Sequence, residues 1–388
     1  MAATGAKRVG VIGAGMVGVC AASWLQRDGH KAFLIEAGEP GHGASFGNAG
    51  CFNGSSVTPM SIPGTIRNVP RWLIDPLGPL SLRWRYLPAI APWLVRFVRA
   101  GTPQKVHAQA RALRPLVGPS LEALRPLVSA AGAEDLIHRL GHLYVYRSAE
   151  SLAKDRLVWE LRRENGVEID EFDADELRQL EPALSRDYVR GVLVRENGHT
   201  SSPLKLVERL LEHFLHSGGE IVHARARGFR FDGSRLTAIE TDTGDHAANA
   251  AIVCAGAYSK PLAAALGDKV PLETQRGYHL MIADPEVMPR IPTADADGKL
   301  SRPRWPQDCA LPAPSSSRVS PHRPIGGAPI SCWRRAARCC PASPPPTLKS
   351  ASRCGWAIAR ACPTRCRFLV PRVPRLTSST PSATAMPA

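Results

Sequence analysis

The feature that most constrains this chain is a strand, glycine turn, helix and second strand near its N-terminus. A β-branched run at 8–12 ends in Gly13-Ala14-Gly15-Met16-Val17-Gly18, a helical stretch runs to Gly29, and a strand at 32–35 ends in Glu36. The first glycine permits the tight turn, the second lets the backbone approach a pyrophosphate, and the third lets helix and strand pack closely. This order predicts a Rossmann-like dinucleotide-binding unit.

The same unit predicts which cofactor groups it contacts. The free N–H groups and the positive dipole end of the helix stabilise phosphates, so we expect the turn at 13–18 to lie against a pyrophosphate. Glu36 can accept hydrogen bonds from a ribose 2′-OH and would repel a 2′-phosphate, which disfavours NADP. FAD and NAD share this fingerprint, so the turn leaves the choice between them open.

Charge and composition divide the chain near residue 300. Residues 301–388 hold 14 Lys and Arg against one acidic residue, Asp308, a net charge of +13, whereas residues 1–300 carry only +2. Seven of the ten cysteines and 16 of the 35 prolines also lie in this last stretch. A basic disordered arm that binds nucleic acid is one interpretation of the tail. The nearly neutral body predicts no nucleic-acid partner.

The cysteines and histidines of the body predict no metal site. Cys20, Cys51 and Cys254 are far apart and form neither a C-x-x-C motif nor a disulfide framework, which suits a reducing cytosol. His142 and His199 have no second ligand at metal spacing beside them, so we interpret both as surface or core histidines.

Two further segments resemble the D-amino-acid oxidase superfamily of flavoproteins, and bacterial D-amino-acid dehydrogenases most of all. The run Gly43-Ala44-Ser45-Phe46-Gly47-Asn48-Ala49-Gly50 resembles the loop that this family wraps around FAD. The resemblance implies that Ser45, Asn48, Ala49 and Gly50 contact the cofactor. A strand at 250–254 followed by Ala255-Gly256 resembles the family's second glycine turn near FAD.

The resemblance covers residues 1 to about 300 and implies a two-domain α/β fold. We expect a discontinuous Rossmann-like FAD-binding domain over 1–75 and 195–266, and an α+β substrate domain with a mostly antiparallel sheet over 76–194 and 267–300. Residues 301–388 are expected to form a low-order tail. Apolar residues at helical spacing from Leu204 to Phe214, then Gly218-Gly219 and a strand at 220–223, predict the return of the chain to the nucleotide domain.

The resemblance also implies the chemistry. A D-amino acid would bind through its carboxylate and lose a hydride to the flavin, and the imino acid would hydrolyse to a 2-oxo acid and ammonia. By resemblance the strand at 275–279 approaches the flavin from the substrate side, so Tyr278 and His279 are candidate catalytic residues. An ordinary strand of alternating polar residues explains these two at least as well.

The electron acceptor and the location follow less directly. The first apolar run of the N-terminus is already a strand and not the core of a secretory signal, and no 18-residue uncharged run is expected to span a bilayer, which predicts a cytoplasmic protein. The stretch 70–96 is rich in Trp, Leu and Arg. We favour an amphipathic helix and loop packed on the core. The alternative is peripheral contact with the inner face of the cell membrane, with electrons passing to a quinone of the respiratory chain.

The genetic code offers a sharper interpretation of the tail. When the third base of each codon is combined with the first two of the next, Trp305-Pro306 encodes Ala and Trp356-Ala357 encodes Gly. In this neighbouring frame residues 301–317, 355–371 and 379–387 permit ATPMATGLRFAGTVEF, MGHRPSLPDSLPVLGP and YAFGHGHA, which resemble three family segments in order. The sequence therefore predicts that the tail is out of frame. We call the product of the neighbouring frame after residue 300 the frame-restored chain.

Three rival functions remain. An amine oxidase of glycine or sarcosine belongs to the same superfamily. An NAD-dependent Rossmann dehydrogenase would explain the first 36 residues but neither the loop at 43–50 nor the turn at Gly256. The third rival is a non-enzyme, either an inactive frameshifted product or a nucleic-acid binder with a basic tail. The resemblance implies that the Arg of the HRP segment pairs with the substrate carboxylate through its guanidinium, and the printed tail lacks this Arg.

Overall fold

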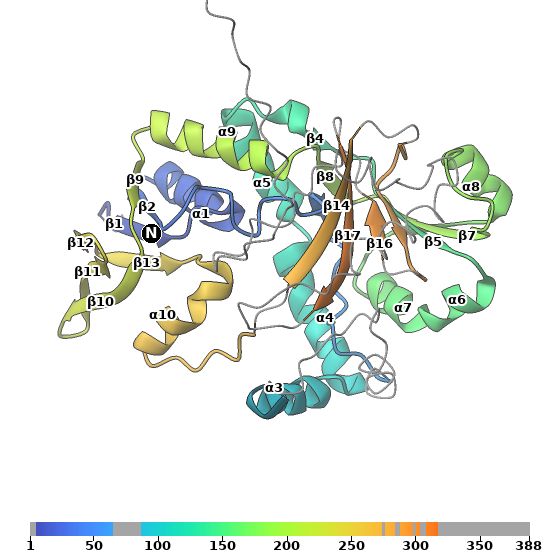
Figure 1. Cartoon of the computed structure of the whole chain (residues 1–388), viewed down its shortest axis with the longest axis horizontal. Coiled ribbons are helices and arrows are strands. Elements are labelled where there is room, and N and C mark those ends of the chain that lie inside the picture. Colours follow the sequence, from blue (N-terminus) through green and yellow to red (C-terminus); the bar gives the residue numbers. More distant parts are fainter. Residues whose placement is uncertain are drawn as a thin grey trace, which may run out of the picture.

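The computed structural model describes residues 5–64, 87–273, 276–283, 288–297, 300–302 and 308–316. The part built on the nucleotide fingerprint lies on the left of Figure 1, and a second part with its own sheet lies on the right.

A four-stranded parallel sheet, ordered β13-β1-β2-β9, is the centre of the first part. Its strands are β1 (Arg8–Ile12), β2 (Lys31–Glu36), β9 (Glu220–His223) and β13 (Ala250–Val253). The predicted strands at 8–12, 32–35 and 220–223 are thus confirmed. The apolar run 32–35 is buried throughout because parallel strands are covered on both faces.

Helices cover one face of this sheet. They are α1 (Met16–Arg27), α5 (Ser120–Ala130) and α9 (Pro203–His216), which share a core with the sheet around Val11, Leu34 and Phe214. The prediction of a helix over 204–214 is confirmed. Helix α1 ends where Gly29 takes a positive φ of 83°, a conformation that favours glycine.

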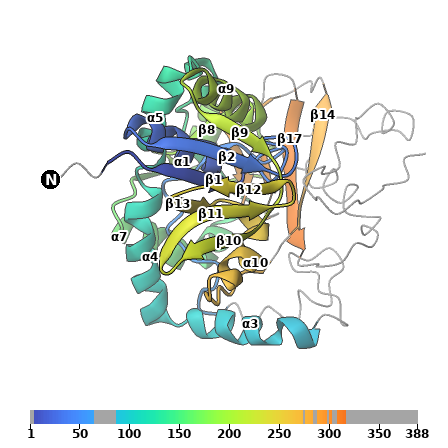
Figure 2. The ribbon, with the colours of Figure 1, turned by 90° about the vertical axis from the view of Figure 1, so that its left-hand side faces the viewer.

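An antiparallel meander covers the other face of the parallel sheet. It consists of β10 (Ala226–Asp232), β11 (Arg235–Thr241) and β12 (Gly244–Ala247), and helix α10 (Ser259–Ala265) packs nearby. Ile239 and Leu262 join Ile12, Phe33 and Ile35 of the parallel sheet in a second core. Figure 2 shows the parallel strands between the helices and this meander.

The second part contains a five-stranded sheet, ordered β16-β15-β5-β7-β6. Its strands are β5 (His142–Tyr146), β6 (Ile169–Phe172), β7 (Arg190–Val194), β15 (Thr293–Asp295) and β16 (Leu300–Arg302). Every pair is antiparallel except β15 with β5, which matches the expected mostly antiparallel sheet. The accompanying helices are α6 (Ala149–Lys154), α7 (Arg156–Glu164) and α8 (Ala174–Leu180).

A small sheet ordered β3-β8-β4 joins distant stretches of chain. Its strands are β3 (Cys51–Phe52), β4 (Ile137–His138) and β8 (Gly198–Thr200). Among the described residues there are also the helices α3 (Leu87–Ala100) and α4 (Pro103–Val117) and the 3-10 turns η2 (Glu134–Leu136) and η3 (Gly256–Tyr258). Across the described ranges no helix is long and apolar enough to cross a bilayer.

Part of the predicted low-order tail is strand. Strand β16 includes residues 301 and 302, and β17 (Asp308–Ser316) pairs antiparallel with β14 (Arg276–Ala283). The pairing places Pro312 opposite His279, although proline lacks the N–H that a ladder needs. The other tail residues lie outside the described part. The domain bounds given above stay a prediction.

Candidate functional site

The glycine turn between β1 and α1 has the geometry for which its residues were singled out. Gly13 has a φ of 108°, and a Cβ atom there would lie 2.5 Å from the Cys254 carbonyl oxygen. A Cβ atom on Gly18 would lie 1.8 Å from the Gly13 carbonyl oxygen. Both contacts are with backbone, which cannot rotate away as a side chain can. Tight turning and close helix–strand packing therefore require glycine at these two positions.

The start of α1 is open to an anion. A Cβ atom on Gly15 would meet only the Ser45 hydroxyl, at 3.2 Å, so the backbone here is accessible. Met16 N–H donates to that hydroxyl at 2.9 Å, Val17 is 70% exposed, and the first turn of α1 contains no acidic residue. The positive end of the helix is thus uncompensated by a carboxylate of its own first turn, which suits a pyrophosphate.

Glu36, at the end of β2, stabilises the glycine turn by hydrogen bonds to the backbone. Its carboxylate accepts the Ala14 N–H at 2.7 Å through Oε2 and the Gly38 N–H at 2.9 Å through Oε1. Each carboxylate oxygen has a second lone pair, so these bonds leave acceptor sites for a ribose hydroxyl. Glu36 therefore holds the turn in shape and retains the acceptors that the sequence analysis assigned to it.

Residues 43–50, here called the cofactor loop, fold over the start of α1. Asn48 fixes the loop from within: its Nδ2 donates to the carbonyls of Ala44 and Ser45 at 3.1 and 3.2 Å, and its Oδ1 accepts the Gly50 N–H at 2.7 Å. Gly50 has a φ of 66°, and a Cβ atom there would lie 2.8 Å from the Thr200 carbonyl oxygen. Ala49 lies between these two, and its carbonyl accepts the Cys51 thiol at 3.6 Å.

The second predicted turn meets the first. Cys254 N–H donates to the Ile12 carbonyl at 2.8 Å, and an added Cβ atom on Gly13 would lie 3.2 Å from Ala255 Cα. Gly256 follows with a φ of 53° and opens η3. Both turns leave the carboxyl ends of neighbouring parallel strands, the edge at which open α/β sheets bind ligands.

The structure thus gathers most of the residues predicted to contact the cofactor at one sheet edge, namely Gly13, Ala14, Gly15, Met16, Val17, Gly18, Glu36, Ser45, Ala255 and Gly256. Asn48, Ala49 and Gly50 follow in the cofactor loop, where Gly50 lies against Thr200. An FAD fits this set, because the accessible Gly15 backbone and the open helix start suit its pyrophosphate. Tyr278 and His279 are on β14, as predicted, but their side chains lie outside the described part.

We expect Glu36→Gln in the frame-restored chain to weaken FAD binding about tenfold, a loss of about 1.4 kcal/mol. Glutamine offers one acceptor oxygen where two N–H groups now donate, so the turn loses a charge-assisted bond. Titration of the apoprotein with FAD, followed by flavin fluorescence, gives the affinity. The control is Glu39→Gln, because the Glu39 side chain is 73% exposed in the same stretch. Equal affinities for both variants would contradict this role.

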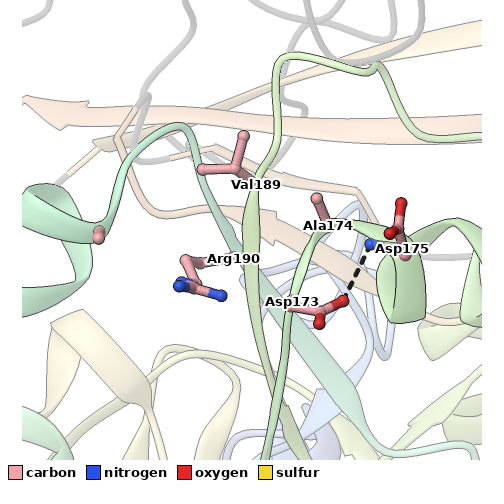
Figure 3. Close-up of a pocket in the computed structure, with 6 residues that line it drawn as sticks. Asp173, Ala174, Asp175, Val189 and Arg190 are labelled. Atoms are coloured by element: carbon pink, nitrogen blue, oxygen red, sulfur yellow. Dashed lines mark hydrogen bonds between the residues drawn. The ribbon is translucent and has the colours of Figure 1, made fainter.

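A separate surface hollow is not a second candidate for the functional site. It has a volume of about 330 Å³ and is lined by Ala149, Asp173, Ala174, Asp175, Val189 and Arg190. Figure 3 shows Asp173 accepting the Asp175 N–H, at 2.9 Å, where α8 begins. Its carboxylate also accepts the Glu176 N–H, as a helix cap does. The Asp173 carboxylate in the hollow therefore caps α8.

Within the described ranges, no group of three His, Cys, Asp or Glu residues could hold a metal ion. His142 is 5% exposed and His199 is fully buried, so both are core histidines. Burial, and to a smaller extent the neighbouring Arg162 and His199, lower the pKa of His142 to about 4. His142 is therefore neutral at pH 7.

Comparison with known proteins places these features in one family. The family described as FAD dependent oxidoreductase, DAO, matches residues 8–377. A D-amino-acid oxidase from Bradyrhizobium diazoefficiens is 44% identical over 297 residues, 76% of this chain and 70% of the relative. A D-amino acid dehydrogenase from Rhizobium rhizogenes is 27% identical over 301 residues, 76% of this chain and 72% of the relative.

Solved structures share the fold. Glycine oxidase from Geobacillus kaustophilus superposes with a TM-score of 0.61 at 19% identity, covering 86% of this chain and 79% of that one. The FAD-bound L-alpha-glycerophosphate oxidase from Mycoplasma pneumoniae superposes with a TM-score of 0.58 at 14% identity, covering 87% and 79%. At such identities these structures establish the architecture and leave the substrate to other arguments.

Proposed function

Because this chain belongs to the FAD dependent oxidoreductase family, we propose that it oxidises D-amino acids to 2-oxo acids and ammonia. The observation that carries the proposal is the 44% identity to a D-amino-acid oxidase, together with the cofactor edge built by the glycine turns. The D-amino acid dehydrogenases at lower identity support the same substrate class.

The cofactor edge explains what the chain itself contributes. Bound FAD supplies the two-electron acceptor, and the protein supplies orientation and electrostatics. The open start of α1 would hold the pyrophosphate and Glu36 would accept from the ribose, while the cofactor loop covers the helix start through Ser45. We propose that Tyr278 or His279 hydrogen-bonds the substrate amine or the flavin edge as a catalytic residue, and the position of both on strand β14 supports this proposal.

The names of the relatives indicate different electron acceptors, because one relative is an oxidase and others are dehydrogenases. The sequence left a quinone and oxygen both open as acceptors. A respiratory quinone would go with peripheral membrane contact of the stretch that leads into α3, which is the alternative to packing of this stretch on the core. This helix carries Arg96 and Arg99 and no acidic residue, which suits an anionic surface. An anaerobic assay with a soluble quinone analogue, beside an oxygen-uptake assay, decides between the two acceptors.

We also propose that the printed tail is out of frame. Strand β17 supports this idea, since its printed residues DCALPAPSS include two prolines and no β-branched residue. The neighbouring frame permits LRFAGTVEF there, which suits a strand far better. The match to the family continues to residue 377 and marks no boundary at 300. The proposal therefore rests on the codons and on β17.

The visible spectrum tests the proposed reaction. We expect the frame-restored chain to show flavin absorbance that bleaches under anaerobic conditions with D-alanine, because the flavin takes up the hydride, and to remain oxidised with L-alanine. Glycine and sarcosine serve as further substrates that test the amine-oxidase alternative. Bleaching by these two and by neither alanine enantiomer would replace the D-amino acid assignment. A colourless protein after added FAD would reject the function as a whole.

A further inference from the structure

A short stretch joins the cofactor loop to the second part of the molecule. After Gly50 the chain forms β3 and then turns through residues 53–55, here called the linking segment, with sequence Asn-Gly-Ser. Only the two residues of β3 separate this segment from the loop, so a shift of the segment moves the loop. What holds the linking segment therefore bears on the cofactor.

Asn197, just before β8, forms two hydrogen bonds with Ser55. Its Oδ1 accepts the Ser55 N–H at 3.3 Å, and its Nδ2 donates to the Ser55 hydroxyl at 3.0 Å. Both residues are fully buried, so no solvent replaces these bonds when one partner is removed. The Asn197 carbonyl also accepts the Gly141 N–H at 3.1 Å, which ties the same residue to the start of β5.

Two arginines hold the backbone carbonyls of the linking segment. Arg114 of α4 donates to the Gly54 carbonyl at 3.0 Å, and Glu196 fixes its guanidinium by bonds of 2.6 and 2.9 Å. Arg162 of α7 donates from Nε to the Ser55 carbonyl at 3.3 Å and is only 7% exposed. Its guanidinium lies over the rings of Trp159 and Tyr144, at 4.4 and 4.9 Å from their centroids, which fixes its direction.

The first residue of the segment has a partner as well. His142, at the start of β5, lies 3.1 Å from Asn53 through Nδ1 and Oδ1. Because the amide oxygen is an acceptor, Nδ1 carries the proton and donates it. Gly54 completes the fit, since a Cβ atom there would lie 2.9 Å from the Gly118 carbonyl at the end of α4.

We propose that these four side chains, Arg114, His142, Arg162 and Asn197, form a polar clamp that positions the cofactor loop for FAD. Asn197 is its central positioning residue. The clamp brings together α4, β5, α7 and the approach to β8, all from the part of the chain between the two halves of the nucleotide sheet. It thus couples the substrate side of the molecule to the loop at 43–50. This inference rests on the proposed function insofar as that loop contacts FAD.

Two partly buried thiols make the proposal measurable. Cys51 lies between the loop and the linking segment, and Cys20 lies in α1. Burial raises the pKa of each thiol to about 12, so both react slowly until the surrounding structure opens. The rate of alkylation of Cys51 by iodoacetamide is divided by that of Cys20, both resolved by peptide mass spectrometry in the full chain. This ratio reports local opening at Cys51, because global unfolding exposes both thiols and cancels from it.

We expect Asn197→Ala to raise this ratio about tenfold and to weaken FAD binding by the frame-restored chain about tenfold, the loss expected for buried groups left unpaired. Asn197→Asp should recover much of both, since its two oxygens can accept the Ser55 N–H and O–H. The matched control is Asn249→Ala, which removes the acceptor of the Arg8 N–H, at 3.0 Å, at the start of β1 and so at the end of that strand opposite the glycine turn. This control should leave the ratio and the affinity unchanged.

Two outcomes overturn the proposal. An alkylation ratio in Asn197→Ala equal to that of Asn249→Ala would show that the clamp does not hold the segment. A raised ratio with unchanged FAD affinity would show that the clamp stabilises the linking segment without positioning the cofactor loop. If the parent frame-restored chain binds no FAD, the proposed function and the cofactor role of the clamp both fail, while the alkylation ratio still decides whether the clamp holds the linking segment.

Discussion

Gly18→Ala is expected to reduce FAD binding by the frame-restored chain at least a hundredfold. The added Cβ atom would lie 1.8 Å from the Gly13 carbonyl oxygen and 2.9 Å from its carbon, so α1 must move away from β1. Overpacking of this kind costs about 1–3 kcal/mol, and here it also displaces the helix start that faces the pyrophosphate. Bound flavin per protein, read from the visible absorbance after purification with added FAD, gives the result.

The control for this variant is Gly5→Ala. A Cβ atom on Gly5 meets nothing within 4 Å, and the residue lies outside the glycine turn. Thermal unfolding of both variants, followed by circular dichroism, separates a loss of cofactor from a loss of fold. Normal flavin content in Gly18→Ala would mean that the turn tolerates a side chain, and the steric argument for the fingerprint would then be wrong.

Restoring the reading frame is expected to have the second large effect. The printed chain should purify with little or no flavin, and the frame-restored chain should carry close to one flavin per protein. The reason is that the neighbouring frame supplies strand formers at β17, an Arg in the HRP segment and the glycine–histidine turn of the family. The frame-restored chain is obtained from the printed coding sequence by inserting one base or deleting two bases between codons 298 and 304.

Flavin content and thermal stability of the two chains, prepared in parallel with added FAD, make the comparison. Sequencing the DNA over the same codons shows independently whether the shift is present in the gene. Equal flavin content in both chains would refute the idea that the printed tail is damaged, and residues 301–388 would then need an explanation as a genuine basic segment.

The nucleotide-binding part could be predicted in detail because its signals are local. Strand, turn, helix, strand and Glu36 follow one another within about thirty residues, and each residue type has a steric or electrostatic reason that a single segment reveals. The helix at 203–216 and the strand that follows it were readable for the same reason, since apolar periodicity and a glycine stop signal are properties of short windows.

The polar clamp could not be predicted in this way. Ser55 and Asn197 are 142 residues apart, and Gly54 and Arg114 are 60 apart. A buried asparagine or arginine has no sequence period that announces its partner. Sequence reasoning interpreted His142 as an ordinary histidine, and only the packing of β5 against the linking segment gives it a role.

The sequence by itself determined the Rossmann-like start, because the residues expected to face a pyrophosphate are contiguous and chemically restricted. It also indicated the cofactor and the family, through the resemblance of residues 43–50 and 250–256 to family segments. Tertiary structure alone decided that Glu36 braces the Ala14 N–H, that β15 pairs parallel with β5, and that four distant side chains hold residues 53–55. These features depend on which surfaces meet when the chain closes. Hydrogen bonds between distant segments are selected by that closure and not by local propensity.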